Sequence, residues 1–327
     1  MLRPYKRRIF RLSLILVVTL ILTLFPFLAS CSNANNNYAS TAFAVHYLDV
    51  GEGDATLIKL PDGKIVLIDS GPSSKRAIKA VKEKISLYSN KIDYLILTHP
   101  DIEHVGGVVS LLEDFTVSVA YVPKITNSTN TPFYHKILSE LSTRKVDIRY
   151  SKAFLEIVGQ DYALAFLSPY EQGDLSSYDR YNLIEFPSEE DKDDLSPIIY
   201  LEYQKIRFLF CSDAGVIEQE SVFKNCTAQL YDNLFFASDG FSLEDIDFYK
   251  VSRHGDKDAC LQEFIEYMKP KNAIISVGGF NMRGHPSEKV LLALEKANPN
   301  YSLYRTDRDK TISVYVYNGV YEIKTGD

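Results

Sequence analysis

The sequence predicts an α/β fold in which two mixed β-sheets are covered by helices. From residue 43, short segments rich in β-branched and aromatic residues alternate with turns, and segments with helical spacing follow them. The same plan returns in the second half, without a repeat of fixed period. Strand meanders joined by helical crossovers are typical of mixed sheets with helical layers on their faces.

The composition supports a folded domain and excludes several other classes of protein. The 327 residues are 46% hydrophobic and 24% charged, with 16 Gly, 13 Pro and 4 Cys. Disordered chains have less apolar content, and collagen-like or disulfide-dense scaffolds need more Gly or Cys. The formal net charge is -7. An acidic protein does not hold long nucleic acid by general attraction, so such binding would require a local basic site.

The amino terminus has the pattern of an export signal. Five basic residues up to Arg11 precede an uncharged, mostly apolar run from Leu12 to Ala29. The run ends in Leu28-Ala29-Ser30-Cys31, which resembles a bacterial lipobox, in which the cysteine is lipidated and becomes the first residue. An uncleaved membrane anchor stays open as the alternative, because a run of eighteen residues can span a bilayer.

These features divide the chain into three parts. We expect a lipoprotein signal peptide over residues 1–30, a flexible Asn- and Ser-rich tether over 31–42, and one folded domain over 43–327. The mature protein would be an extracytoplasmic lipoprotein held at the membrane through Cys31, with a formal charge of -12.

The folded part begins with a meander. The first expected strands lie at 43–50, 55–60 and 64–68, separated by a Gly-Glu-Gly turn and a Pro-Asp-Gly turn. Residues 73–88 have apolar side chains at helical spacing and lysines on the other face. The other expected helices span 105–112, 132–141, 260–268 and 287–297, and the other expected strands span 94–97, 163–167, 198–203, 206–210, 248–251, 273–277, 301–304 and 312–317.

Two features are expected to have no chemical role. Cys211, Cys226 and Cys260 show no C-x-x-C spacing, and we interpret them as buried free thiols, with a disulfide between Cys226 and Cys260 left open. The acid-rich stretch 185–194 lacks the glycine that calcium-binding loops need, so we interpret it as a solvated loop.

The residues that carry chemistry gather after one predicted strand. His99, Asp101, Glu103 and His104 fall within six consecutive positions directly after the strand 94–97. Alternate residues share a face in an extended loop, and the adjacent Glu103 and His104 can serve a second ion. The spacing therefore predicts a site for two metal ions.

Other His and Asp residues occur in similar positions. His254 and His285 lie beside Gly or Pro after predicted strands, and Asp213 follows the strand 206–210. A carboxylate there can bridge two cations that lower the pKa of a shared water toward neutrality. His46 and His135 lack this setting, and we interpret them as structural.

Taken in order, these motifs resemble those of the metallo-β-lactamase superfamily, and in particular the hydrolase-like domain of ComEC-type DNA-uptake (competence) proteins. The matching segments are Leu48–Ala55, Leu67–Gly71, Leu97–Gly107, Phe208–Gly215, Lys250–Gly255 and Gly284–Ser287. The resemblance covers about residues 43–317. It implies a mixed α/β (α+β) fold with four layers, the αββα metallo-β-lactamase sandwich, and a metal site along one edge of both sheets.

The resemblance also implies a set of ligands for two divalent metal ions. His99, Asp101 and His254 would hold one ion, Glu103, His104 and His285 would hold the other, and Asp213 would bridge them. Asp54 would lie beside the site, and Asp69 would orient a ligand. Because the set contains four imidazoles and three carboxylates, manganese competes with zinc.

Three positions depart from the family pattern. Glu103 stands where the family has Asp, which lengthens a ligand by one methylene, and Ser212 stands where the family has Gly. Arg253 replaces the first His of a His-His pair and adds a fixed cation suited to phosphate. Loss of catalysis, leaving a metallo-β-lactamase-fold interaction module, therefore stays open.

The sequence as a whole predicts an exported, lipid-anchored binuclear metallohydrolase that acts on a phosphodiester. Glu103, Asp213 and Arg253 are the residues expected to act in catalysis. DNA is the first substrate that the resemblance implies, which would make the protein a nuclease. A phosphodiesterase for cell-envelope polymers of choline or teichoic-acid type is the alternative enzyme. No protein partner is inferred.

Overall fold

The computed structural model describes residues 43–125, 132–171, 193, 195–234 and 241–326. They belong to one unit of the chain, which begins at Phe43. The predicted signal peptide, the tether and Cys31 lie outside the described residues, as does most of the acid-rich stretch 185–194. Within the described ranges, no helix is both long enough and apolar enough to cross a membrane.

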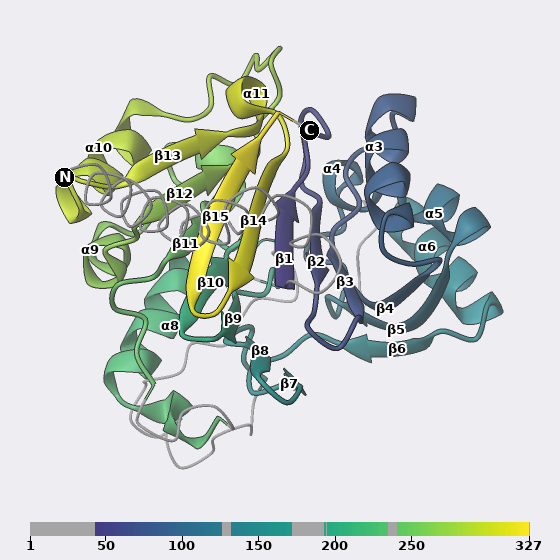
Figure 1. Cartoon of the computed structure of the whole chain (residues 1–327), viewed down its shortest axis with the longest axis horizontal. Coiled ribbons are helices and arrows are strands. Elements are labelled where there is room, and N and C mark those ends of the chain that lie inside the picture. The colour runs from purple at the N-terminus through teal and green to yellow at the C-terminus, as the bar shows by residue number, and fades with distance from the viewer. Residues whose placement is uncertain (1–42, 126–131, 172–192, 194, 235–240, 327) are drawn as a thin grey trace, which may run out of the picture. The chain divides into compact units, whose positions relative to one another are not determined.

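Two mixed sheets form the centre of this unit (Figure 1). The first runs in the order β15-β14-β1-β2-β3-β4-β5-β6, with strands at Val320–Thr325, Ile312–Tyr317, Phe43–Tyr47, Thr56–Lys59, Ile65–Ile68, Lys91–Ile96, Thr116–Val122 and Asp147–Tyr150. The second runs in the order β13-β12-β11-β10-β9-β8-β7, with strands at Ser302–Arg305, Asn272–Ile275, Phe248–Lys250, Ile206–Phe210, Ile199–Tyr203, Tyr162–Phe166 and Glu156–Val158.

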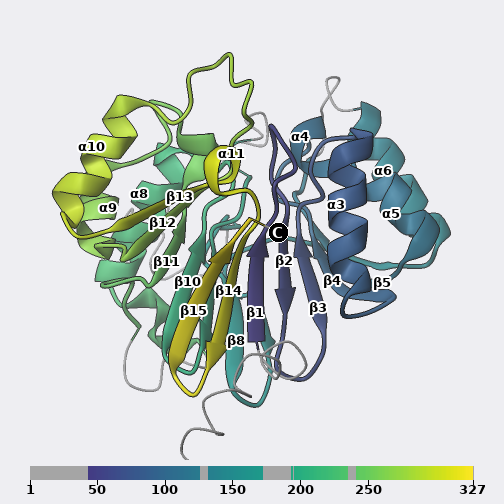
Figure 2. The same ribbon diagram turned by 45° about the horizontal axis from the view of Figure 1, so that its top comes forward.

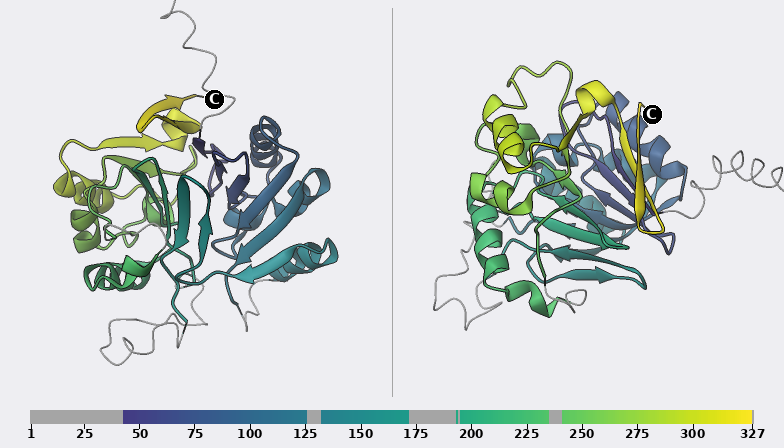
Figure 3. Two further views of the ribbon diagram at one scale, coloured as in Figure 1. Left: turned by 60° about the horizontal axis from the view of Figure 1, so that its bottom comes forward. Right: turned by 60° about the vertical axis from the view of Figure 1, so that its left-hand side comes forward.

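Helices cover the outer face of each sheet, and the four layers are visible in Figure 2 and, from two further directions, in Figure 3. The first sheet is covered by α3 (Lys75–Ser86), α5 (Val108–Asp114) and α6 (Pro132–Thr143). The second is covered by α8 (Val216–Thr227), α9 (Gln262–Met268) and α10 (Glu288–Ala297). Shorter helical segments are α4 (Ile102–Val105), α11 (Thr306–Asp309), η1 (Leu230–Asn233) and η2 (Ser252–Gly255). The predicted α/β class and four-layer αββα sandwich are confirmed.

An aromatic core joins the two sheets. Phe208 of β10 stacks on Phe248 of β11 with 4.8 Å between ring centroids, and Phe43 of β1 lies 4.7 Å from Tyr203 of β9. All four rings are buried. Since β1 and β9 belong to different sheets, such contacts hold the sheets together by removing large apolar areas from water.

Each covering helix presents an apolar stripe to its sheet. In α3, Ala77, Val81 and Ile85 are buried, as the sequence spacing predicts. Ser74 fixes the start of this helix, because its hydroxyl accepts a hydrogen bond of 3.2 Å from the backbone N–H of Ala77.

The predicted helix over 105–112 is wrong in one respect, since the structure has two short helices there. α4 ends at Val105 and α5 begins at Val108. A Cβ atom on Gly106 would lie 2.4 Å from the backbone nitrogen of Ser73, so a larger residue has no space at this point. Two glycines, Gly106 and Gly107, therefore separate the helices at the point where this backbone packs closely against another segment.

The predictions for the structural histidine and the cysteines are confirmed. Cys211, Cys226 and Cys260 are buried and free. His46 is buried, with Nδ1 2.8 Å from the Ser313 hydroxyl and Nε2 2.9 Å from the Tyr88 hydroxyl. Burial, helped by the charge of Lys84, lowers the pKa of His46 to about 3.

Candidate metal centre

The candidate site lies at the edge where parallel strands of both sheets end. β3 pairs in parallel with β4, and β10 pairs in parallel with β11. The segments that leave the carboxyl ends of these four strands contain Asp69, His99, Asp213 and His254, in that order. This edge carries the labels α4 and α11 in Figure 2. Strand ends of this kind place polar side chains where a ligand can reach them.

Four metal-binding side chains converge at this edge. Single ligand atoms of Asp54, His104, Asp213 and His254 all lie within 4.8 Å of one another. His104 is fully buried, and the other three are at most 9% exposed. We call these four residues the donor cluster.

Hydrogen bonds hold both imidazoles of the donor cluster in one orientation. His104 Nδ1 lies 3.0 Å from Asp69 Oδ2, and its Nε2 lies 3.2 Å from Asp213 Oδ2. His254 Nδ1 lies 2.9 Å from the carbonyl oxygen of Ser276. A carboxylate or carbonyl partner on Nδ1 leaves Nε2 as the metal-binding atom, which is the usual arrangement of metal-ligating histidines.

The donor cluster fits a divalent cation because several of its buried polar atoms have no other partner. Among the described residues, His254 Nε2 and Asp213 Oδ1 have no hydrogen-bond partner, and His104 Nε2 has none besides its contact with Asp213 Oδ2 of the same cluster. Unpaired polar atoms are costly in a protein interior. One ion bound by these three atoms would remove that cost, and imidazole with carboxylate is a donor set for zinc or manganese.

A tight backbone turn brings His254 to this position. Arg253 and His254 adopt the left-handed conformation, with φ of 48° and 54°, directly after β11. The backbone N–H of Arg253 donates to the carbonyl of Ser212, at 2.7 Å, and so ties this turn to the loop of Asp213. Such strained turns of non-glycine residues are found at functional sites, where the surrounding structure stabilises them.

Asp69 supports the donor cluster through several hydrogen bonds. Its carboxylate accepts from the Thr98 backbone N–H at 2.8 Å and from the Thr98 hydroxyl at 2.5 Å. The Ser212 hydroxyl donates to the same carboxylate at 3.2 Å. With its contact to His104, Asp69 has the geometry of a residue that orients a ligand, which is the role that the resemblance implies.

A buried lysine neutralises Asp54. Lys250 Nζ lies 2.9 Å and 3.0 Å from the two carboxylate oxygens of Asp54, and both side chains are almost fully buried. Burial alone would raise the pKa of Asp54, but the charges of Lys250, His254 and His104 outweigh it and lower this pKa. Asp54 is therefore a fixed anion that lies between the ammonium group and the two imidazoles.

Without a metal ion, His104 and Asp213 form a buried ion pair. Burial opposes both charges, but their mutual attraction prevails and lowers the pKa of Asp213 well below its usual value. The charges of Asp213 and Asp69 likewise raise the pKa of His104 well above its usual value, against the effect of burial. A metal ion would replace the proton on His104, so metal binding should release protons.

The remaining predicted ligands lie nearby, with other partners. His99 Nε2 is 2.9 Å from Asp193 Oδ1, and Asp101 Oδ2 is 3.8 Å from His99 Nδ1. Glu103 Oε1 lies 3.4 Å from Arg283 Nη1. The structure thus brings Asp213, His104 and His254 together. His99, Asp101 and Glu103 lie nearby, each in contact with another side chain.

The four histidines form a row along the edge. Successive ring centroids are 5.2 Å apart for His99 and His104, 5.8 Å for His104 and His254, and 6.4 Å for His254 and His285. His285 Nε2 lies 3.2 Å from Asp256 Oδ2, and its Nδ1 is buried without a hydrogen-bond partner in the described residues.

Four residues of this centre were not predicted correctly from the sequence. Asp54 was given a different role, and Lys250, Asp193 and Asp256 were given none. Asp54 was expected beside the site but belongs to the donor cluster, and Lys250 was given no role. A lysine within the apolar strand β11 was an available signal, because a buried ammonium needs a partner. Asp193 and Asp256 carried no such signal, since both stand in segments with several other acidic residues.

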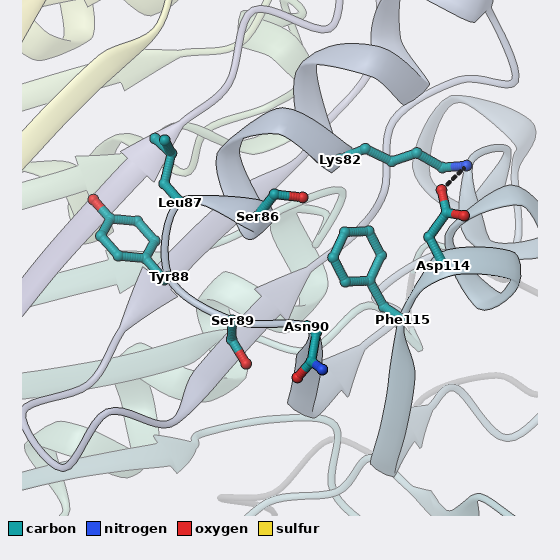
Figure 4. Close-up of a pocket in the computed structure, with 8 residues that line it drawn as sticks. All are labelled: Lys82, Ser86, Leu87, Tyr88, Ser89, Asn90, Asp114 and Phe115. Atoms are coloured by element: carbon teal, nitrogen blue, oxygen red, sulfur yellow. Dashed lines mark ion pairs between the residues drawn. The ribbon is translucent and has the colours of Figure 1, made fainter.

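A cavity of about 420 Å³ lies at the other edge of the first sheet (Figure 4). It is lined by Lys82, Ser86, Leu87, Tyr88, Ser89, Asn90, Asp114 and Phe115. Its residues precede β4 and β5, whereas His99 follows β4 at the opposite end. Lys82 and Asp114 neutralise each other there, at 2.6 Å. The cavity is therefore separate from the metal chemistry.

Comparisons with known proteins agree with this reading of the fold. Residues 48–194 match the family model of the metallo-beta-lactamase superfamily. ComE operon protein 3 of Bacillus subtilis (strain 168) is 27% identical over 295 residues, which cover 84% of this chain. The match covers 33% of ComE operon protein 3, so this chain corresponds to about a third of that protein.

Two solved structures are among those to which this chain is similar at low identity. One is Igni18, a metallo hydrolase from Ignicoccus hospitalis KIN4/I, with 13% identity and a TM-score of 0.48 over 84% of this chain and 98% of that chain. The other is the metallo-beta-lactamase fold protein YhfI from Bacillus subtilis, with 7% identity and a TM-score of 0.45 over 86% of this chain and 99% of that chain.

The sequence match and the observed topology lead to one conclusion. Residues 48–194 resemble metallo-β-lactamase superfamily domains, the described residues form the αββα sandwich, and the chain is similar to the aligned third of ComE operon protein 3.

Proposed function

We propose that this protein is an exported, lipid-anchored metallohydrolase that cleaves phosphodiesters, with DNA as its first candidate substrate. The observation that carries the proposal is the convergence of three buried ligand atoms, His104 Nε2, His254 Nε2 and Asp213 Oδ1, that have no hydrogen-bond partner outside the donor cluster among the described residues. A bound divalent ion, zinc or manganese, would supply a hydroxide nucleophile by lowering the pKa of its water. Nucleic acid is the first candidate substrate because the motifs resemble those of ComEC-type DNA-uptake proteins, and the 27% identity to ComE operon protein 3 agrees with that resemblance.

The protein's own residues would hold and orient the reacting groups. His104, His254 and Asp213 would hold the ion, with Asp69 fixing His104 and the Ser276 carbonyl fixing His254. With two ions bound, His99 and Asp101 would join His254 at one ion, Glu103 and His285 would join His104 at the other, and Asp213 would bridge them, as the resemblance implies. Their use would require His99, Glu103 and His285 to exchange their present partners, Asp193, Arg283 and Asp256, for the metal.

Arg253 is suited to bind the substrate phosphate. Its guanidinium group is 35% exposed and forms an ion pair with Asp193, which also contacts His99. Burial would lower the pKa of Arg253, but the nearby carboxylates of Asp193 and Asp213 raise it, so the group stays charged. Guanidinium groups bind carboxylate and phosphate oxygens in the same geometry. A phosphate oxygen could therefore replace the Asp193 carboxylate.

Turnover of a small diester tests this proposal. We expect the full chain, loaded with zinc or manganese, to hydrolyse bis(p-nitrophenyl) phosphate, and the Asp213→Asn variant to lose nearly all of that activity. Asp114→Asn is the matched control, because Asp114 is an exposed carboxylate that pairs with Lys82 at the opposite edge of the first sheet.

Two results would redirect or overturn the proposal. Hydrolysis of the small diester without cleavage of single- or double-stranded DNA at low salt would point to a cell-envelope polymer as the substrate. No hydrolysis of any diester by metal-loaded protein would leave a non-catalytic interaction module of the same fold.

A further inference from the structure

Two large apolar side chains stand almost completely in solvent on the loop that joins β12 to α10. Phe280 is 99% exposed and Met282 is 98% exposed, whereas the next most exposed large apolar residue of the described chain is Leu87, at 69%. Single exposed apolar residues are common on protein surfaces. Two of them on neighbouring positions of one loop indicate a contact surface.

The loop of these residues borders the site. It joins β12 to α10 over residues 277–287 and rises above the edge where the strands end (Figure 2). At its tip, Arg283 Nη1 lies 3.4 Å from Glu103 Oε1. At its end, His285 stacks on His254 of the donor cluster, with 6.4 Å between centroids and 14° between planes. Phe280 is five residues from His285, so the chain between them spans at most about 18 Å, which is within the reach of a few nucleotides of a bound strand.

Hydrogen bonds hold the shape of this loop. The Asn281 side chain accepts from the His285 backbone N–H at 3.0 Å and donates to the His285 carbonyl. At the start of the loop, the Thr306 hydroxyl accepts from the Val277 N–H at 2.8 Å and donates to its carbonyl at 3.0 Å. A loop held in this way presents Phe280 and Met282 without a large ordering cost on binding.

From this arrangement we propose that the loop 277–287 binds a base of a single-stranded nucleic acid, which stacks on Phe280 against Met282. The inference rests on the proposed phosphodiester hydrolysis and names the substrate's form. Aromatic side chains next to cationic groups are the usual means of holding single strands, because every base has a face that can stack. The bases of a duplex are already stacked on one another and cannot use such a surface.

The charge of the loop agrees with this partner. Residues 277–287 contain Arg283 and no carboxylate, although the chain as a whole has a net charge of -7. Arg283 is 58% exposed and contacts two carboxylates, Glu103 at 3.4 Å and Glu52 at 4.0 Å, so a backbone phosphate would have to replace one of them. The loop therefore offers a ring and a thioether to one nucleotide, with a guanidinium group at their side that can exchange partners.

Tryptophan fluorescence can test the contact directly, because the chain contains no Trp. In the full chain carrying Phe280→Trp, we expect an oligothymidylate to quench the emission at low salt. An oligonucleotide of the same length with abasic sites should quench it weakly and bind about tenfold less tightly, which is the usual contribution of one stacked base. Val320→Trp is the matched control, because Val320 is 65% exposed and starts β15 at the opposite end of the unit, so its emission should not change.

A second variant measures the same contact without a new fluorophore. Phe280→Ala combined with Met282→Ala should weaken binding of a labelled oligothymidylate by tenfold or more, whereas Val320→Ala should not weaken it. Equal affinity of wild type and the double variant would overturn the inference. So would a Phe280→Trp emission that shifts with phosphatidylglycerol vesicles and ignores the oligonucleotide, since the loop would then contact a membrane.

These binding measurements are separate from the test of hydrolysis. If wild-type protein fails to cleave the small diester while the Phe280→Trp emission responds to oligothymidylate, the hydrolytic proposal is wrong and the binding surface stands. If wild type cleaves the small diester and the emission shows no response, the binding surface is wrong and hydrolysis stands.

Discussion

At the scale of single residues, the buried ion pair of Lys250 and Asp54 should be the most sensitive structural contact beside the site. Removal of one partner leaves the other charge buried without compensation, which costs about 3–5 kcal/mol. We expect Lys250→Met to lower the free energy of unfolding of the full chain by that amount, measured by thermal unfolding. The pair Lys271 and Asp247 offers a control, because the Lys271 side chain is 50% exposed and Lys271→Met should cost much less.

The double variant of that pair separates charge from packing. Asp54→Asn added to Lys250→Met removes the uncompensated charge and should restore part of the lost stability. If Lys250→Met and Lys271→Met lower the unfolding temperature equally, the buried pair of Lys250 and Asp54 contributes no more to stability than the partly exposed pair of Lys271 and Asp247.

His46 should make stability depend on pH. Its folded-state pKa of about 3 lies below the ordinary value of 6.5, so protonation occurs first in the unfolded chain. The stabilising effect of neutral His46 is complete above pH 6.5 and is lost as the pH falls toward 3. Between pH 6.5 and 4.5 we expect wild type to lose about 2–3 kcal/mol more than His46→Gln. Parallel losses in the two proteins, measured by unfolding at each pH, would contradict this assignment.

The sequence identified most individual site residues but not their contacts. His104, His254 and Asp213 were predictable because each follows a predicted strand in a motif with Gly or Pro. The ion pair of Asp193 with Arg253 was not predictable, since a contact between positions 60 residues apart depends on how the chain folds. Sequence spacing reports which donors are available, whereas their partners depend on tertiary structure.

At the scale of elements, the break between α4 and α5 positions His104. Gly106 approaches the backbone at Pro72 and Ser73, and Gly107 approaches Ser70, so both sites exclude a side chain. We expect Gly106→Ala to lower the free energy of unfolding by about 1–3 kcal/mol, as overpacking does. Gly279→Ala should have little effect, because a Cβ there meets no atom within 4 Å. Equal unfolding temperatures of Gly106→Ala and Gly279→Ala would contradict this expectation. The backbone at Gly106 could then move away from Pro72 and Ser73 at no cost.

Buried elements were easier to predict than exposed ones. β1, β3 and β10 are short apolar runs, and their positions follow from hydrophobicity alone. β15 and β6 are largely exposed edge strands without a clear alternation, and neither was predicted from the sequence. Their pairing with β14 and β5 depends on the neighbouring strand, which sequence patterns do not report.

At the scale of the whole chain, the proposed membrane attachment depends on Cys31. If the lipobox prediction is right, the mature protein begins at Cys31, incorporates labelled palmitate and partitions into detergent. We expect Cys31→Ala to abolish the label, and Cys260→Ala to retain it because Cys260 is a buried thiol of the folded domain. A label that survives Cys31→Ala, or a mature protein that retains Met1, would favour a simple membrane anchor.

The fold explains how distant motifs build one centre. Asp54 and Asp213 stand 159 positions apart, yet both join the donor cluster because the segment between the antiparallel strands β1 and β2 lies at the same edge as the segment that follows β10. The central claim is that this cluster holds a metal ion.

Equilibrium dialysis of the full chain against zinc or manganese, followed by elemental analysis, tests that claim most directly. We expect at least one tightly bound ion per chain, proton release on binding, and loss of the ion in Asp213→Asn but not in the control Asp114→Asn. Wild-type protein that binds no ion, or Asp213→Asn protein that binds as much metal as wild type, would contradict the account.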